Sequence, residues 1–138
     1  MEELNIAADI KVFGQPVKTF PQGIGKAFDK LIQMLPGGFD RSFYGISFMG
    51  KNGGMIYIAA AIELLEGEAE KYNCERYTIE KGNYLAEKIT MWRDKTASIN
   101  NVFHQLMQNN NADKTKPAVE WYKSEAEMFC MVKSIAMQ

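Results

Sequence analysis

Residues 116–132 read KPAVEWYKSEAEMFCMV and place an acidic residue, Glu120, in the middle of a run whose neighbours predict a β-strand. Aromatic and β-branched residues favour strands, whereas glutamate is depleted in them and its charge is costly to bury alone. Two interpretations explain the residue. Glu120 is either an exposed strand residue paired across the sheet with a lysine such as Lys133, or part of a ligand site.

The two faces of this strand carry different residues. Because successive strand side chains point to opposite faces, Glu120 and Tyr122 share one face with the small Ala118, and Val119 and Trp121 share the other. We expect the valine and tryptophan to face the helix-covered core. The glutamate is then expected to face a cleft, where apolar surroundings raise the pKa of a carboxyl group unless a cation is present.

The composition is that of one globular domain, residues 1–138, with 46% hydrophobic and 24% charged residues. The formal net charge is −1 and the lysines are scattered, so direct binding of nucleic acid is not expected. The longest apolar run, MIYIAAAI, is too short to cross a membrane, and the acidic N-terminus lacks a leader pattern. We therefore expect a cytoplasmic protein in which Cys74 and Cys130 are free thiols.

The first half of the chain, about 8–65, predicts a strand, a helix and two further strands. A strand is expected over 8–20, and the helix that follows carries an apolar stripe of Ile24, Phe28, Leu31, Ile32 and Leu35. The next two strands, over 42–50 and 55–64, are joined by KNGG. An Asn-Gly pair between apolar runs indicates a hairpin in which both residues adopt positive φ.

The second half, about 74–137, repeats this order. Extended chain with a turn at Lys81-Gly82 is expected over 74–92, and a helix over 95–108 is expected to begin at Asp94 as its N-cap. The apolar stripe of this helix consists of Ile99, Val102, Phe103, Leu106 and Met107. Two strands follow, in 118–124 and 127–137. The pattern predicts an α+β fold of two β-α-β-β units in a pseudo-twofold arrangement, with a cleft between the halves.

Conventional catalytic and metal motifs are missing from the sequence. His104 is the only histidine, lies off the apolar stripe of its helix, and has no cysteine or aspartate pattern around it to form a zinc site. A Ser/His/Asp set, a GxGxxG turn and a P-loop are likewise absent. We therefore expect neither a metal nor a cofactor.

Several aromatic residues are candidates for the walls of a cleft around Glu120. Each falls in or beside an expected strand, where aromatic residues are also common in ordinary cores. The candidate ligand-binding residues beside Glu120 are Tyr44, Tyr57, Tyr84, Trp92, Trp121 and Tyr122.

Two segments resemble the gyrase-inhibitor-like family, whose effector-binding domains also occur attached to AraC-type and MerR-type regulators. They are YTIEKGNYLAEKI, residues 77–89, and KPAVEWY, residues 116–122, which are similar to the family's aromatic turn and its P-x-x-E-x-Y strand. The order of strands and helices is similar as well. The first half departs from the better-known form of the family, and residues 66–72 look like a local variation.

The resemblance implies a pseudo-twofold domain that binds amphipathic or cationic aromatic small molecules, with the acidic residue of the E-x-Y strand, here Glu120, in contact with the ligand. Both expected helices are used by the duplicated units, so a helix-turn-helix is not expected and the chain resembles free-standing members.

Three functions follow from these expectations. The first is a small-molecule-binding domain for sensing or sequestration, related to transcription regulation. The second is a hydrolase of strained cyclopropane rings, known in a subset of free-standing members, in which Glu120 would be the general base and tyrosine hydroxyls would orient the leaving group. The third is a protein-interaction role, with a protein partner as for the gyrase inhibitor, which depends on analogy of fold alone.

Overall fold

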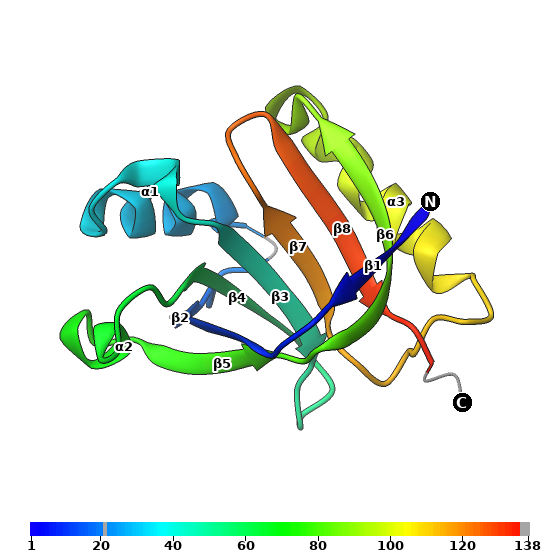
Figure 1. The fold of residues 1–138 in the computed structure, drawn as a ribbon, viewed down its shortest axis with the longest axis horizontal. Coiled ribbons are helices and arrows are strands. Elements are labelled where there is room, and N and C mark those ends of the chain that lie inside the picture. The colour runs from blue at the N-terminus through cyan, green and yellow to red at the C-terminus, as the bar shows by residue number, and fades with distance from the viewer. Residues whose placement is uncertain (21, 136–138) are drawn as a thin grey trace.

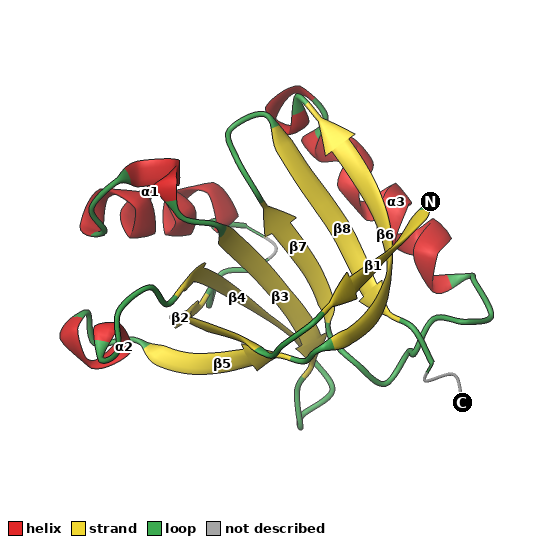
Figure 2. Ribbon diagram, in the orientation of Figure 1, coloured by secondary structure: helices red, strands yellow, loops and turns green. Residues whose placement is uncertain are grey.

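Eight antiparallel strands form one curled sheet, and helices flank it (Figures 1 and 2). The structure is a computed structural model that describes residues 1–20 and 22–135. The strand order is β1-β6-β8-β7-β3-β4-β2-β5, so the fold is α+β as expected. In this described part of the chain, no helix has the length and apolar character needed to cross a bilayer.

The first half of the chain contains every element that its sequence pattern predicts. Three short elements in or beside this half were not predicted: strand β1, the 3-10 turn η1 and helix α2. In order, the elements are β1 (Glu2–Ile6), β2 (Ile10–Pro16), α1 (Ile24–Met34), the 3-10 turn η1 (Gly38–Asp40), β3 (Phe43–Met49), β4 (Met55–Ile62) and α2 (Glu68–Lys71).

The second half differs from its prediction mainly before the helix. The extended chain expected there is two strands, and 3-10 turns precede the helix, which begins at Ile99. Asp94 ends the first of these turns, so its predicted role as N-cap is wrong. The elements are β5 (Glu75–Ile79), β6 (Gly82–Thr90), η2 (Trp92–Asp94), η3 (Thr96–Ser98), α3 (Ile99–Met107), β7 (Ala118–Tyr122) and β8 (Glu127–Lys133).

The predicted hairpin between β3 and β4 is present, but its turn differs from the expected one. Gly53 adopts φ 85°, whereas Asn52 is not among the described residues with positive φ. The Gly53 amide donates to the Gly50 carbonyl at 3.0 Å, and the Gly50 amide donates to the Gly54 carbonyl at 2.7 Å. This is a longer loop closed by one left-handed glycine, a common alternative to the two-residue turn.

Pairings between distant strands join the two halves into a single sheet. β3 pairs with β7 in the middle, β1 pairs with β6 of the second half, and β5 pairs with β2 of the first half. The two halves therefore share one continuous sheet. Whether they are related by a twofold duplication stays a prediction.

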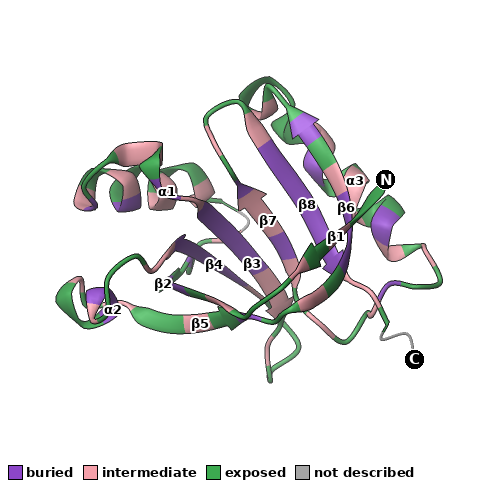
Figure 3. Cartoon of the chain, in the orientation of Figure 1, coloured by how far each residue is buried: buried purple, intermediate pink, exposed green. Residues whose placement is uncertain are grey.

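The two faces of the sheet bury separate clusters, and the helices lie on the face opposite to the one predicted. Tyr122 of β7 packs in one cluster with Leu31 of α1 and Leu106 of α3, whereas Val119 belongs to the cluster on the other face. The alternation along β7 was predicted correctly, but the helix-covered face is the one that carries Glu120. Figure 3 shows the buried residues running along the central strands β3 and β8.

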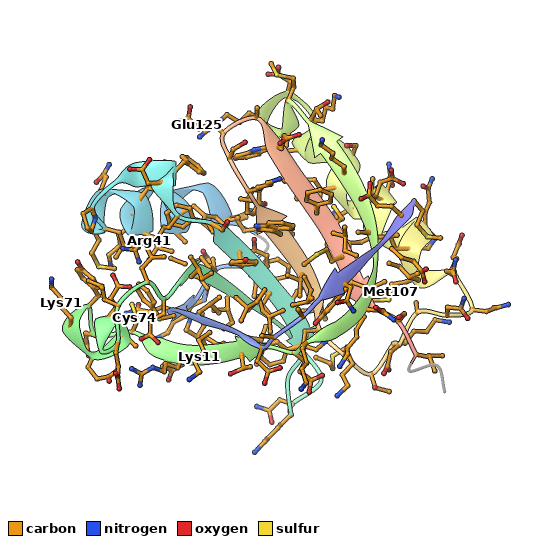
Figure 4. All side chains as sticks on the ribbon, viewed as in Figure 1. Lys11, Arg41, Lys71, Cys74, Met107 and Glu125 are labelled. Carbon is orange, nitrogen blue, oxygen red and sulfur yellow. The ribbon has the colours of Figure 1, made fainter. Side chains whose placement is uncertain are left out.

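A buried ion pair joins α2 to the chain before β3. Both nitrogens at the end of the Arg41 side chain bond to the Glu68 carboxylate, at 3.0 and 2.9 Å, and each residue is only 5% exposed. The backbone amides of Leu64 and Leu65 donate to the same carboxylate, at 2.7 and 3.1 Å. Figure 4 labels Arg41 between α1 and α2. The pair joins helix α2 to the chain before β3, beside the core contact that Ala69 makes.

Desolvation by itself would raise the pKa of Glu68, but hydrogen bonds from Arg41, Leu65 and Leu64 outweigh it and lower the pKa to about 2. The unfolded chain therefore binds the proton more tightly than the folded one does. The stability that Glu68 contributes is present above the unfolded pKa and is lost as the pH falls from about 5 to about 2.

We expect Glu68→Gln to lower the free energy of unfolding at pH 7 by about 3 kcal/mol, because it leaves the Arg41 charge buried without its partner. Urea denaturation measures the change. Glu70→Gln is the matched control on the same helix, since the exposed Glu70 carboxylate pairs with the exposed Arg76. Equal losses in the two variants would contradict a special role for the buried pair.

Candidate functional site

A cavity of about 630 Å³ lies on the helix side of the sheet. Its walls come from α1, η1, the turns before α3, α3 itself and the inner strands β3, β4 and β7. Eight of the described lining residues are aromatic, and the rings besides those of Tyr57 and Tyr122 are Phe20, Phe28, Phe39, Phe43, Trp92 and Phe103. A volume of this size suits a drug-sized molecule.

Three polar side chains meet at the sheet wall of this cavity. The hydroxyl of Tyr57 on β4 donates a short hydrogen bond to Oε1 of Glu120 on β7, and the hydroxyl of Tyr122 donates to the same oxygen at 2.9 Å. Both tyrosines are buried, at 3% and 7% exposure. Among the described residues no hydrogen bond reaches Oε2 of the carboxylate.

A glycine on the strand between them makes this contact possible. β3 lies between β4 and β7, and Gly45 of β3 is the register partner of both Ala59 and Glu120. A Cβ atom added at Gly45 would collide with the Tyr57 hydroxyl and with Oε1 of Glu120. Because Gly45 has no side chain, Tyr57 can reach across β3 to the carboxylate.

Ring contacts fix the two tyrosines in place. Phe20 stacks on Tyr57 with ring centroids 5.1 Å apart, and Phe28 meets Tyr122 edge-on at 5.2 Å. Trp92 meets Tyr122 edge-on at 4.8 Å, and its indole N–H donates to the Ser124 carbonyl at 3.0 Å. Edge and offset contacts of this kind are favourable ring geometries. The acid therefore sits in a preformed aromatic frame.

Burial raises the pKa of Glu120 above its usual range, although hydrogen bonds from Tyr57 and Tyr122 act in the opposite direction. Desolvation and the nearby Glu120 charge raise the pKa of both tyrosine hydroxyls, so these stay protonated donors. Burial also raises the pKa of Cys130, the register partner of Glu120 on β8, to about 12. The thiol is therefore an uncharged neighbour of the acid.

Of the two interpretations of Glu120, the one that pairs it as an exposed residue with a lysine such as Lys133 is wrong. Lys133 donates to Glu80 at 3.0 Å instead, and no ion pair of the described residues includes Glu120. Those residues also hold no cluster of three or more His, Cys, Asp or Glu side chains suited to a metal. Glu120 is thus a carboxyl group in an aromatic cavity, and no residue that the structure describes forms an ion pair with it.

The structure brings together four of the seven candidate site residues: Glu120, Tyr57, Tyr122 and Trp92 all line the cavity. Sequence reasoning did not select the phenylalanines of the cavity wall, Gly45, or the charged lining residues Asp29 and Arg93. Phe28 and Phe103 belong to the apolar stripes of the two predicted helices. The helical periodicity of the sequence is therefore the signal that could have indicated them.

The other three candidates, Tyr44, Tyr84 and Trp121, lie in the cluster on the opposite face of the sheet. Tyr84 donates to the Glu80 carbonyl at 2.6 Å, and Trp121 donates to the Ser42 hydroxyl at 3.1 Å. Tyr44 is the register partner of Trp121, one residue from the pair formed by Gly45 and Glu120. Strand alternation therefore directs these side chains away from the cavity.

The fold is similar to that of several solved structures. One is an integron cassette protein from the mobile metagenome of Vibrio cholerae, with TM-score 0.72, 14% identity, and coverage of 97% of this chain and 95% of that one. Another is SAV2435 bound to tetraphenylphosphonium, with TM-score 0.66, 16% identity, and coverage of 96% and 94%. A third is a candidate bacterial transcription regulation protein from Staphylococcus aureus MU50, with TM-score 0.58, 16% identity, and coverage of 96% of each chain.

No family model matches the chain, and no curated protein sequence matches it. At these identities the likeness to the solved structures shows the fold alone. The structure of SAV2435 contains a bound small molecule, and that observation applies to SAV2435 itself.

We expect Gly45→Ala to disrupt the site, because the new methyl group would occupy the position of the Tyr57–Glu120 contact. Forcing an extra methyl group into a packed site typically costs about 1–3 kcal/mol, which urea denaturation measures. Gly25→Ala is the matched control: Gly25 also lines the cavity, but an added Cβ there meets nothing within 4 Å, and alanine favours its helix. Unchanged stability in Gly45→Ala would contradict the described geometry.

The raised pKa of Glu120 predicts that ionisation of this group lowers the stability of the folded protein as the pH rises. The folded state binds this proton more tightly than the unfolded chain, so the associated stability is full below the unfolded pKa and is lost as the pH rises through the folded value. We therefore expect Glu120→Gln to be more stable than the unmodified protein at pH 8 and close to it at pH 4. Denaturation at both pH values tests this, with Glu3→Gln on exposed β1 as the variant that should show no such difference.

Proposed function

We propose that this protein binds amphipathic small molecules that carry a positive charge beside aromatic surface, with Glu120 as the opposite charge. The observation that supports this most directly is a carboxyl group set among aromatic rings with no cationic side chain paired to it in the described residues. Leaving such a group unpaired is unfavourable, and a cationic ligand would relieve that cost.

The arrangement of donors supports a ligand at one particular oxygen. Tyr57 and Tyr122 both bond to Oε1, and they hold the carboxylate in one orientation while Oε2 stays without a hydrogen bond among the residues described. A cation near Oε2 would also lie among the surrounding rings, and contact with a ring face adds cation–π attraction of about 0.5–2 kcal/mol. The ligand would thus gain from charge and ring contact together.

The comparisons add independent support. SAV2435, which shares the fold, is bound to tetraphenylphosphonium, a cation surrounded by aromatic rings. Another structure of this fold belongs to a candidate transcription regulation protein. We extend both observations to this chain as a proposal: binding serves to sense or sequester such compounds, as expected for a gyrase-inhibitor-like, multidrug-binding domain.

A hydrolase is the second candidate, and the pKa of Glu120 favours it. A carboxyl group with a raised pKa, held by two tyrosine hydroxyls, is suited to general acid–base catalysis. In that case Glu120 would activate water and Tyr122 would orient the leaving group of a strained ring. An inhibitory protein contact of the gyrase-inhibitor kind remains a prediction, with no observation that favours it over these two.

We expect tetraphenylphosphonium to bind the protein and Glu120→Gln to weaken that binding about tenfold or more, because the half-buried counter-charge is lost. Isothermal titration calorimetry measures both affinities. The affinity of the unmodified protein should rise with pH as Glu120 loses its proton, since the cation and the proton compete for the carboxylate. The variant should show no such rise.

Glu3→Gln serves as the matched control, because it removes the same charge from an exposed position on β1. Equal affinity in the Glu120→Gln variant and in the unmodified protein would contradict the proposed role of the acid. Recovery of a cyclopropane-bearing ligand after incubation separates the two candidate functions. Unchanged compound indicates binding alone, and an opened ring that depends on Glu120 indicates the hydrolase.

A further inference from the structure

The rim of the cavity, which we define as its two exposed charged lining residues Asp29 and Arg93, carries a guanidinium group on an aromatic support. The Arg93 Cζ atom lies 4.8 Å from the ring centroid of Trp92 and 5.8 Å from that of Phe39. Trp92 belongs to the second half of the chain and Phe39 to the first. Arg93 therefore lies over rings from both sides of the cavity.

The backbone before Arg93 adopts a conformation that places it there. Met91 has φ 52° and ψ 45°, a left-handed conformation that is uncommon for a residue with a side chain. The Met91 amide donates to the Ala126 carbonyl at 2.6 Å, and the Trp92 indole donates to Ser124 at 3.0 Å. The β7–β8 turn thus holds this corner of the chain, and strained backbone of this kind gathers at functional sites.

The Arg93 guanidinium has hydrogen-bond donors that no described residue accepts from. In the parts of the chain that the structure describes, no hydrogen bond and no ion pair includes Arg93. A guanidinium that lies over a ring uses its face for that contact, and its N–H groups in the plane stay available for a carboxylate or phosphate. Arg93 is therefore positioned to donate hydrogen bonds to an anionic group of a ligand.

The cavity consequently carries opposite charges at two separated places. Glu120 is the acid at the sheet wall, and Arg93 is the only basic side chain among the described lining residues. From this juxtaposition we infer that Arg93 determines specificity, and that the preferred ligands are zwitterionic aromatic compounds whose cationic part faces Glu120 and whose acidic group binds Arg93. The inference rests on the proposed function and narrows its class of ligand.

Asp29 limits where the acidic group can lie. It is exposed on α1 and would repel a ligand carboxylate placed near it, so the favourable position is on the Trp92 side of the rim. Removing the Asp29 charge should leave binding of an acidic ligand unchanged or improve it. This is the opposite of the effect expected at Arg93, and it separates a specific contact from a general dependence on rim charge.

Two dyes that differ only in this group provide the test. Rhodamine 110 carries a free carboxylate beside its cationic ring system, and rhodamine 123 is its methyl ester, so the comparison isolates the acid. We expect Arg93→Gln to raise the Kd of rhodamine 110 about tenfold, because a charge-assisted hydrogen bond is lost, and to change that of rhodamine 123 less than threefold. Fluorescence anisotropy measures both values.

Lys95→Gln is the matched control, since Lys95 is an exposed cation two residues away that does not line the cavity. It should alter neither Kd, and Asp29→Asn should not weaken rhodamine 110. If Arg93→Gln leaves the ratio of the Kd of rhodamine 110 to that of rhodamine 123 unchanged, the inference is overturned. The proposed function is then unaffected. If neither dye nor tetraphenylphosphonium binds the unmodified protein, the proposed function fails and the inference fails with it.

Discussion

A carboxyl group held inside an aromatic cavity is the constraint on which the arrangement of the site depends. Removing Glu120 from water without a cation is unfavourable, so the protein supplies two hydroxyl donors to the same oxygen. Those donors come from strands on either side of β3, and they can converge only because Gly45 leaves space between them. The strand order, the missing side chain at Gly45 and the positions of the two tyrosines thus all contribute to the hydrogen bonds of a single acidic group.

This arrangement sacrifices stability for a binding surface. A core filled with aliphatic side chains would be more stable than one that surrounds a cavity and an acid with a raised pKa. The aromatic frame keeps the empty site in shape, since Phe20, Phe28 and Trp92 all contact the tyrosines. A preformed site reduces the ordering that a ligand would otherwise have to impose.

Periodicity in the sequence was sufficient for the local elements and for the unusual position of Glu120. The stripes of α1 and α3, the β3–β4 hairpin and the alternation along β7 are all present. Alternation separates the faces of a strand but does not show which face a helix will cover, and both faces of β7 are apolar enough for either role. The helix side was therefore assigned wrongly, and Tyr44, Tyr84 and Trp121 were grouped with residues of the opposite face.

Sequence periodicity does not predict features that depend on pairing between distant strands or on single side-chain contacts. Strand β1 is polar and short, and it exists because it pairs with β6, more than 70 positions along the chain. Helix α2 has one turn and no apolar stripe, and the buried contact between Glu68 and Arg41 holds it. A lone arginine has no periodicity, so the sequence pattern does not indicate Arg93, whose position depends on rings that the fold brings together.

The exchange of edge strands between the two halves has a consequence for how the chain acquires its structure. β1 is synthesised before β6, its partner, which emerges only after the whole of the first half, and β2 is likewise synthesised long before its partner β5. Loops this long must close before these contacts can form, which slows folding. Neither half can therefore complete its own edge of the sheet before the strand from the other half has been synthesised.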